Sequence, residues 1–330
     1  MRAPARRQAW GAALAFAFAL VLPAHVASGA DQMPKVPRIG FLEAGGRFVI
    51  EHLTLPLQKL GYVDGKNIVF EFRGAEGKPE RLPELAAELV RLKVDVIVAH
   101  TNIAAFAARD ATSTIPIVVW AAHGALDTGL VRSLARPGGN LTGVESMAPE
   151  IDAKRVQLLK ELVPGLSRLG ALYNAGDQSA PFHVKSTQAA AHVLGVAVVA
   201  LGVRRNEDFD TVFSTVGGKP LDGLLMFTDV LTWRNFKRTT DFAQQERVPT
   251  MCEFKELVVT GCLLSYGPTF AEISARTAEQ IDKILKGAKP GDLPMERVTR
   301  FEMVVNAKTA KALGLTIPRS VLLRADQVIE

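Results

Sequence analysis

The sequence predicts an α/β fold built from two doubly wound parallel sheets, each forming one lobe. Short apolar runs rich in Val, Ile and Leu recur along the chain, mostly 21 to 30 residues apart. Amphipathic segments of helical period lie between these runs. Alternating strands and helices build a parallel sheet covered on both faces, because right-handed crossover connections deposit the helices there. The chain has 330 residues, which suits two domains of ordinary size.

The apolar runs predict ten strands, which is more than one sheet of a chain this long holds comfortably. We therefore expect two sheets of about five strands each. The break is expected at the turn-rich segment 136–140, which reads Arg-Pro-Gly-Gly-Asn. The strands are expected to begin near Arg38, Ile68, Val94, Ile115, Leu141, Leu169, Val196, Leu221, Pro249 and Gly261.

The segments between the strands have the pattern of surface helices. Residues 81–92 place their leucines on one face and their charged residues elsewhere. The same arrangement recurs in 154–162, 187–194 and 273–285. Each of these segments is expected to cover one face of a sheet.

The first thirty residues differ in kind from the rest. Three arginines among the first seven residues make a positive start, and residues 10–22 form an unbroken apolar run. This run is shorter than the roughly 20 residues that a membrane-spanning helix needs. Small residues at 28–30 then offer a cleavage site. The pattern predicts a signal peptide over 1–30, cleavage near Ala30 and a periplasmic location.

Charge and composition exclude several classes of function. The chain is formally +5, from 39 basic and 34 acidic residues, and without the three signal arginines 36 basic residues stand against 34 acidic ones. No long basic run remains, so we expect no nucleic-acid partner. No HExxH, GxSxG or Walker pattern is present, and no GxGxxG follows a strand. We therefore expect no enzyme, with no catalytic residue, no cofactor and no metal.

Two cysteines leave a choice open. Cys252 and Cys262 either form a disulfide that closes a loop of about ten residues, or stay as two free, buried thiols near strand ends. The spacing alone does not show whether the Cα atoms lie close enough for a disulfide, so we slightly favour the free thiols.

Segments along the whole mature chain resemble one known family. They are RIGFL (38–42), GYVDGKNIVFEFRGAEG (61–77), LPELAAELVRLKVDVIVA (82–99), IPIVV (115–119), GLVRSLARPGGNLTGV (129–144), KRVQLLKELVP (154–164), SYGP (265–268), ILKGAKPGDLPME (284–296) and KTAKALGLTIPRSVLLRADQVIE (308–330). They resemble the ABC-transporter substrate-binding proteins typified by tryptophan- and tyrosine-binding receptors, which have the type I periplasmic binding fold.

The resemblance implies an arrangement that composition does not give. The chain crosses three times between the lobes, so that three segments form a hinge. The N-terminal lobe then holds 36–146 plus 269–296, and the C-terminal lobe holds 147–268 plus 297–330. The strand 301–306 belongs to the C-terminal lobe.

The resemblance also implies a function. A small molecule, with an amino acid as the best guess and an aromatic or apolar one preferred, is held in the cleft by hinge closure. The partner is an ABC permease of the inner membrane, and the receptor itself is a monomer. The main alternative is a periplasmic sensing module that serves a membrane signalling receptor. An exported enzyme and a cytoplasmic repressor are disfavoured, the latter by the signal peptide.

Ligands of open α/β sheets bind beyond the carboxyl ends of the strands, where helix N-termini favour a carboxylate. In the first lobe these positions hold Ala44 and Gly45, and Thr101 and Asn102, which either cap the following helix or donate to a ligand. The resembled family usually has Ser or Thr after its first strand, whereas this chain has Glu43.

The fourth strand also departs from that family. It usually carries Asp-Pro after this strand, whereas this chain has Gly-Ala, preceded by Trp120 and His123. We expect both of these side chains to lie at the ligand. The departures concern the ligand more than the fold.

In the second lobe the strand ends supply five candidates for ligand binding: Tyr173, Asn174, Thr228, Asp229 and Glu253. The resemblance implies that Asp229 binds a ligand ammonium group, in a charged hydrogen bond worth about 1.5–3 kcal/mol. The alternative is that Asp229 caps the next helix. Trp120, Tyr173 and Trp233 either form an aromatic wall or pack in the core.

Overall fold

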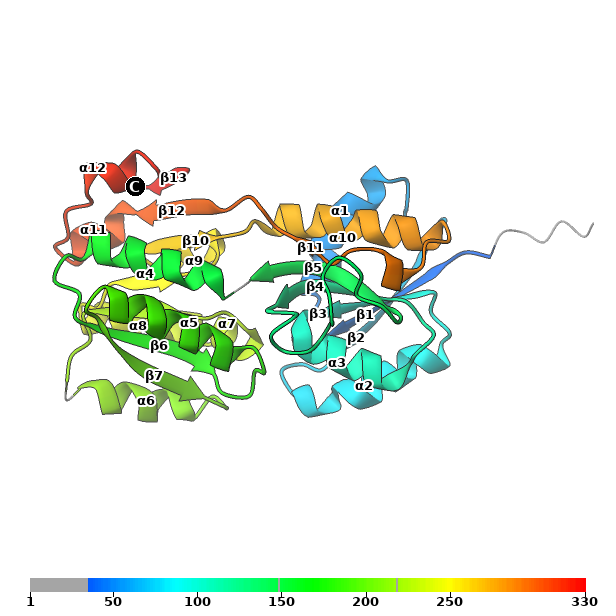
Figure 1. Cartoon of the computed structure of the whole chain (residues 1–330), viewed down its shortest axis with the longest axis horizontal. Helices are drawn as coiled ribbons and strands as arrows, with labels where there is room; N and C mark the ends of the chain where they lie inside the picture. Colours follow the sequence, from blue (N-terminus) through cyan, green and yellow to red (C-terminus); the bar gives the residue numbers. More distant parts are fainter. Residues whose placement is uncertain (1–34, 148, 218) are drawn as a thin grey trace, which may run out of the picture. The chain divides into compact units, whose positions relative to one another are not determined.

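The computed structural model describes residues 35–147, 149–217 and 219–330, and the predicted signal peptide lies outside them. The first sheet has the strand order β11-β5-β4-β3-β1-β2, and all its pairings are parallel (Figure 1). Its strands are β1 (Arg38–Glu43), β2 (Val69–Gly74), β3 (Val96–His100), β4 (Ile117–His123), β5 (Leu141–Met147) and β11 (Glu296–Arg297).

Four helices cover the two faces of this sheet. They are α1 (Phe48–Lys59), α2 (Leu82–Arg91), α3 (Thr101–Ala111) and α10 (Phe270–Leu285). The helices α1 and α10 pack on one face, in a core with Ile39 and Phe41, while α2 and α3 pack on the other face with Leu42 and Ile97. Successive residues of a strand point to opposite faces, so one apolar run supplies both cores.

The second sheet has the strand order β13-β12-β10-β9-β8-β6-β7. Its strands are β6 (Arg168–Asn174), β7 (Ala197–Val203), β8 (Gly223–Met226), β9 (Thr250–Cys252), β10 (Leu264–Gly267), β12 (Glu302–Asn306) and β13 (Gln327–Ile329). The pairing of β10 with β12 is antiparallel, and the others are parallel. An antiparallel neighbour needs no helical crossover, and β12 enters this sheet from the first lobe without one.

Helices also cover both faces of the second sheet. One core holds α4 (Glu150–Leu162), α5 (Ala180–Val193), α11 (Ala307–Ala312) and α12 (Arg319–Leu322). The opposite core holds α6 (Asp208–Gly217), α8 (Phe236–Gln245) and α9 (Lys255–Val259). The short α7 (Val230–Arg234) follows β8.

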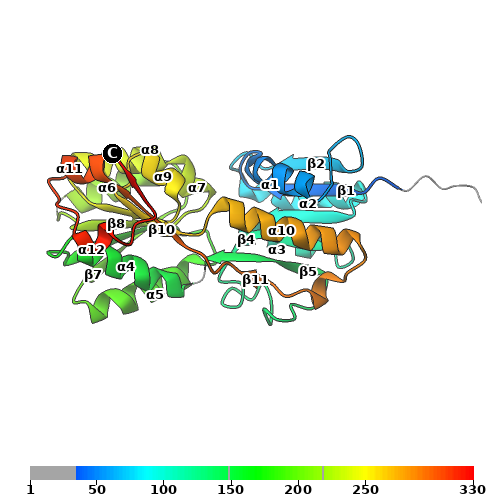
Figure 2. The same ribbon diagram turned by 90° about the horizontal axis from the view of Figure 1, so that it is seen from above.

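Three connections join the sheets, from β5 to α4, from β10 to α10 and from β11 to β12 (Figure 2). The predicted fold class, two doubly wound sheets joined by a three-crossing hinge, is therefore confirmed. Of the helices in the described part of the chain, none is both long and apolar enough to cross a membrane.

The two cysteines form a disulfide, so the slight preference for free thiols was wrong. Their Cα atoms lie 6.5 Å apart, and both side chains are fully buried. Cys252 ends β9, and Cys262 precedes the neighbouring strand β10. The bridge therefore closes the loop that carries α9.

Candidate functional site

A cavity of about 320 Å³ opens at the carboxyl ends of strands from both sheets. The turns after β1 and β3 and the end of β4 line it from the first lobe, and the turn after β8, α7 and the residue after Glu253 line it from the second. This is the position at which doubly wound sheets bind ligands, and the volume suits a small molecule.

Five Phe and Trp rings line the cavity and contact one another. Phe48 at the start of α1 is the central ring, with its centroid 5.7 Å from Trp120, 5.7 Å from Trp233 and 4.9 Å from Phe270. The ring of Phe254 lies 4.4 Å from Phe270. Phe48 and Trp120 belong to the first lobe and Trp233 and Phe254 to the second, so the apolar wall is shared. Such a wall suits a flat, apolar ligand.

Trp120 is a buried part of this wall and is held by a hydrogen bond. Its side chain is only 1% exposed, and its indole N–H donates to the Ser274 hydroxyl on α10, 3.0 Å away. The polar edge of the ring is thus satisfied inside the protein, and the apolar part is left for packing and for the cavity.

The backbone at the cavity is strained in two places. Thr101 and Ala121 both line the cavity and both have φ of 62°. This left-handed conformation is rare outside glycine and rarest for a β-branched residue such as Thr. At Ala121 it coincides with a register shift between β4 and β5, which is typical of a bulge. Strain of this kind costs about 1–3 kcal/mol per residue and tends to collect at binding sites.

Asn102 serves the backbone rather than the cavity. Its side-chain amide donates to the carbonyl of His123 at 2.6 Å and accepts from the N–H of the same residue at 3.0 Å. The side chain is buried. Asn102 therefore fixes the end of β4, which positions His123 at the cavity. Neither Thr101 nor Asn102 caps α3, whose N-cap residue is His100 and has no side-chain cap.

A buried acid occupies the start of α1. Glu43 is 0% exposed, and both of its carboxylate oxygens lie 3.2 Å from the backbone N–H of Val49. Burial raises the pKa of Glu43 to about 7, although the hydrogen bonds from the start of α1 lower it in part. Glu43 thus satisfies the helix start from within the chain.

His100 lies beside this acid. Its Nδ1 is 3.8 Å from Oε2 of Glu43, too far for a hydrogen bond, and is buried with no hydrogen-bond partner among the described residues. Burial, with a smaller contribution from the neighbouring His123 and His52, lowers the pKa of His100 to about 3. His100 is therefore neutral at neutral pH.

Asp229 performs the capping role that the sequence left as an alternative. It is the N-cap of α7: its Oδ1 accepts from the N–H of Thr232 at 2.8 Å, and the Thr232 hydroxyl accepts from the N–H of Asp229. Its Oδ2 accepts from the side-chain amide of Asn174. Burial raises the pKa of Asp229 above its ordinary value. Both oxygens have partners within the protein, and the residue also lines the cavity.

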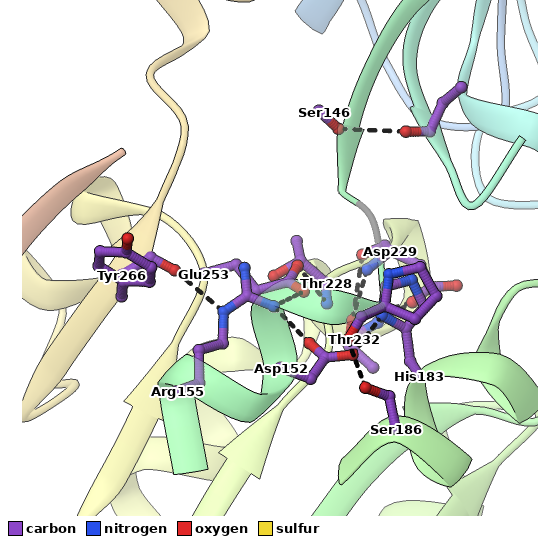
Figure 3. Close-up of polar contacts among 12 residues, drawn as sticks. Ser146, Asp152, Arg155, His183, Ser186, Thr228, Asp229, Thr232, Glu253 and Tyr266 are labelled. Carbon is purple, nitrogen blue, oxygen red and sulfur yellow. Dashed lines mark hydrogen bonds and ion pairs between the residues drawn. The ribbon is translucent and has the colours of Figure 1, made fainter. Parts of the chain in front are cut away.

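A buried ionic network lies beneath the second-lobe wall (Figure 3). Glu253 accepts from the backbone N–H of Thr228 at 2.9 Å and pairs with Arg155 at 3.1 Å. Arg155 also pairs with Asp152 at 2.7 Å and donates to the carbonyl of Tyr266 at 2.9 Å. Glu253 therefore positions the turn after β8 from behind.

His183 completes this network (Figure 3). Its Nδ1 lies 2.7 Å from the Asp152 carboxylate. Burial alone would lower the pKa of His183, but the charge and hydrogen bond of Asp152 and the charge of Glu253 together raise it above its ordinary value. The ring centroid of His183 lies 6.1 Å from that of His123, which brings the network to the edge of the site.

The structure thus brings together six of the eleven predicted ligand-binding residues at the main cavity: Gly45, Thr101, Trp120, His123, Thr228 and Asp229. Three others, Tyr173, Asn174 and Glu253, line a small cavity of about 10 Å³, room for about one water molecule, which shares His123, Thr228 and Asp229 with the main cavity. Ala44 lines a third cavity that adjoins Asp229 and Arg234, and Asn102 lines none of these.

Three rings of the main wall, Phe48, Phe254 and Phe270, were not among the predicted ligand-binding residues. Phe48 and Phe270 are each the first residue of a helix, where the periodicity of an amphipathic helix does not distinguish a core position from a site position. Within residues 35–330, apart from the two masked positions, no three His, Cys, Asp or Glu side chains are grouped to hold a metal ion.

Comparisons with known proteins identify the family of this chain. Residues 47–329 match the family model for "ABC transporter substrate binding protein". A tyrosine-binding protein of Clostridioides difficile (strain R20291) is 29% identical over 259 residues, which cover 78% of this chain and 74% of that protein.

Two solved structures are similar over nearly their whole length. One is an ABC domain from Streptococcus pneumonia in complex with L-Trp, with a TM-score of 0.84, 28% identity and coverage of 89% of this chain and 99% of that one. The other is the ligand-free, open form of a substrate binding protein with adhesive properties from Clostridium difficile, with a TM-score of 0.66, 26% identity and coverage of 89% and 99%. Family and fold are those of substrate-binding proteins of the type I periplasmic binding fold, not of enzymes. The chain belongs to the family of ABC transporter substrate binding proteins.

Proposed function

We propose that this chain is the periplasmic solute-binding component of an ABC import system and captures an aromatic solute, of about the size of an amino acid, between its lobes. The observation that carries the proposal is the edge-to-face contact of Phe48 in the first lobe with Trp233 in the second, whose ring centroids lie 5.7 Å apart at the cavity. A ring wall contributed by both lobes is assembled only when the lobes approach each other. A ligand that fills it therefore stabilises closure.

A second contact between the lobes supports closure at the rim of the cavity. The guanidinium of Arg234 on α7 donates to the carbonyl of Glu76 at 2.9 Å, in the turn after β2. Gly77 lies directly beneath it, has φ of 82° and leaves no room for a Cβ, which would lie 1.8 Å from Nη1 of Arg234. Arg234 thus reaches the first lobe because residue 77 is glycine.

The relatives support an aromatic ligand. One is a tyrosine-binding protein, and a similar solved structure holds L-Trp. The TM-score is 0.84 against that complex and 0.66 against the open, ligand-free structure, although coverage is the same. The lobe arrangement of this chain therefore agrees better with the liganded relative.

The proposal extends to residues and partners. We assign ligand contact to the aromatic wall and to Thr101, His123, Thr228 and Asp229, and lobe boundaries at 36–146 plus 269–296 and 147–268 plus 297–330. We also propose that the protein acts as a monomer and delivers its ligand to an ABC permease of the inner membrane.

A closure experiment tests the proposed function. Small-angle X-ray scattering and thermal unfolding are measured with L-tryptophan, L-tyrosine, tryptamine and indole-3-propionate in turn. At 100 times its Kd a ligand stabilises by about 2.7 kcal/mol, which raises Tm by about 4 °C for a chain of this size. At least one compound should raise Tm by this amount and reduce the radius of gyration. If no compound changes either quantity, the proposed function is wrong.

A further inference from the structure

Glu43 fills the place at which the first lobe would hold a ligand anion. A helix start is a natural site for a carboxylate, because its free N–H groups and its dipole favour negative charge. At the start of α1 the carboxylate of Glu43 already stands 3.2 Å from the N–H of Val49. The protein therefore supplies internally the group that an acidic ligand would bring.

The start of α3 is unfavourable to an anion for a related reason. Its N-cap residue, His100, has its Nδ1 3.8 Å from the Glu43 carboxylate. An anion that approached this helix would also approach Glu43, in surroundings that screen charge poorly. His100 carries no compensating charge, because burial lowers its pKa to about 3.

The cationic side chains of the cavity are engaged elsewhere. Arg47 is exposed and has its guanidinium carbon 5.0 Å from the ring centroid of Phe72. Arg234 is exposed and donates to the carbonyl of Glu76. Neither is buried in the cavity wall as a partner for a ligand carboxylate.

The cavity is favourable to a positively charged ligand. The faces of Trp233 and Phe254 attract a positive charge, and aromatic faces are a common way to bind organic ammonium groups. Glu43 and Asp229 line the same cavity from opposite lobes. When ionised, their carboxylates add a negative potential to the field of the rings.

We propose that this cavity selects aromatic amines, which carry a protonated amino group and no carboxylate, over aromatic acids. The inference rests on the proposed function as a solute receptor and names its ligand class. Glu43 is the residue that determines this selectivity.

The selectivity should depend on pH. The pKa of Glu43 is raised to about 7, so the residue changes charge in the neutral range. An amine favours ionised Glu43, so its affinity should rise between pH 6 and 8, and that of an acid should fall. The titratable groups that act on Glu43 and its neighbour are Glu51, His100, His52 and His123. Glu51 is exposed, and His100 stays neutral throughout this range.

Three indole compounds test the proposal by isothermal titration calorimetry at pH 8. Tryptamine has the amine alone, indole-3-propionate the acid alone, and L-tryptophan both. Tryptamine should bind at least about tenfold more tightly than indole-3-propionate, and as tightly as L-tryptophan. Equal or tighter binding of the acid overturns the proposal, and so does a preference of more than about tenfold for L-tryptophan over tryptamine.

Variants assign the effect to Glu43. Glu43→Gln keeps an acceptor for the N–H of Val49 and removes the charge, so the preference for tryptamine over indole-3-propionate should fall about tenfold. Glu84→Gln is the control: Glu84 is also a glutamate at the start of a helix, but it is exposed on α2. The preference of Glu84→Gln for tryptamine over indole-3-propionate should stay within about threefold of that of the wild type. An unchanged preference in Glu43→Gln overturns the assignment, and so does a pH-independent preference in the wild-type protein.

The experiments distinguish a failure of the proposed receptor function from a failure of the proposed amine selectivity. If L-tyrosine or L-tryptophan closes the lobes while tryptamine does not bind, the receptor function stands and the amine selectivity is wrong. If none of the compounds binds or changes the scattering, both are wrong.

Discussion

Arg155 and Glu253 form an ion pair that solvent does not reach: Nη1 lies 3.1 Å from Oε1, and the side chains are 0% and 2% exposed. The two residues are 98 positions apart, on α4 and directly after β9. The other oxygen of Glu253 holds the backbone of Thr228 at the cavity. A buried charge pair therefore supports the second-lobe wall from behind.

Replacing Arg155 should cost much stability. Arg155→Met leaves Asp152 and Glu253 buried without their shared cation, so the free energy of unfolding should fall by about 3–5 kcal/mol. Lys237→Met is the control, because it breaks an exposed ion pair with Asp241. Its cost should stay below about 1 kcal/mol. Urea unfolding measures both, and equal losses in the two variants would contradict the role assigned to the pair.

Removing one ring of the aromatic wall should weaken binding without unfolding the protein. Trp233 is half-buried and belongs to the short helix α7. Trp233→Ala should cost about 1.5–3 kcal/mol of binding free energy for the tightest ligand found. Trp233→Phe keeps a ring and should recover most of the affinity. Calorimetry on both variants checks this, and unchanged affinity in Trp233→Ala would place the ligand elsewhere.

The disulfide should contribute to stability in its oxidised form. In the chain-entropy account a loop of this length is worth about 2–3 kcal/mol. The double variant Cys252→Ala, Cys262→Ala should therefore have a free energy of unfolding lower by that amount and should unfold at a lower urea concentration. Thiol counting in denaturant, before and after reduction, is the direct check. Two reactive thiols without a reductant would show that the bridge does not form.

Stability should depend on pH through Glu43. The pKa of Glu43 is about 7 in the folded protein against an ordinary value of 4.5, so the folded state binds the proton more tightly. The contribution is fully present below about pH 4.5 and is lost as pH rises through 7, by about 3 kcal/mol in all. Glu43→Gln has no such titration. The difference in unfolding free energy between wild type and variant should therefore change over this range, and a constant difference would contradict the burial of an acid here.

Relieving the strain at Thr101 should stabilise the protein. Thr101→Gly removes the penalty of φ at 62° in a β-branched residue and should raise the free energy of unfolding by about 1 kcal/mol. Ala107→Gly in the interior of the same helix should lower it by about 0.5–1 kcal/mol. Opposite signs in urea unfolding are the expected result. A loss of stability in both variants would show that Thr101 is not strained.

Much of the fold could be predicted from periodicity. The ten apolar runs became β1 to β10, and the segment expected as a helix at 81–92 became α2, which spans Leu82–Arg91. These elements are specified locally, by the spacing of apolar side chains. The antiparallel direction of β12 is not specified locally, because it depends on a connection that returns from the other lobe.

The residues around the cavity were predicted in position more than in detail. The strand-end rule located Trp120, Thr228 and Asp229 at the cavity. It could not show that Asn102 binds the backbone of His123, because that contact joins residues 21 apart on different elements. Nor could it show that Glu43 closes the start of α1, which depends on the residue at which that helix begins.

Native mass spectrometry of the mature protein purified from its host shows most directly whether this chain is a receptor for an aromatic solute. We expect a population heavier than the chain by one small molecule, which unfolding releases intact and which carries an aromatic ring. A released molecule without a ring, or an empty protein that binds none of the four aromatic compounds, would contradict it.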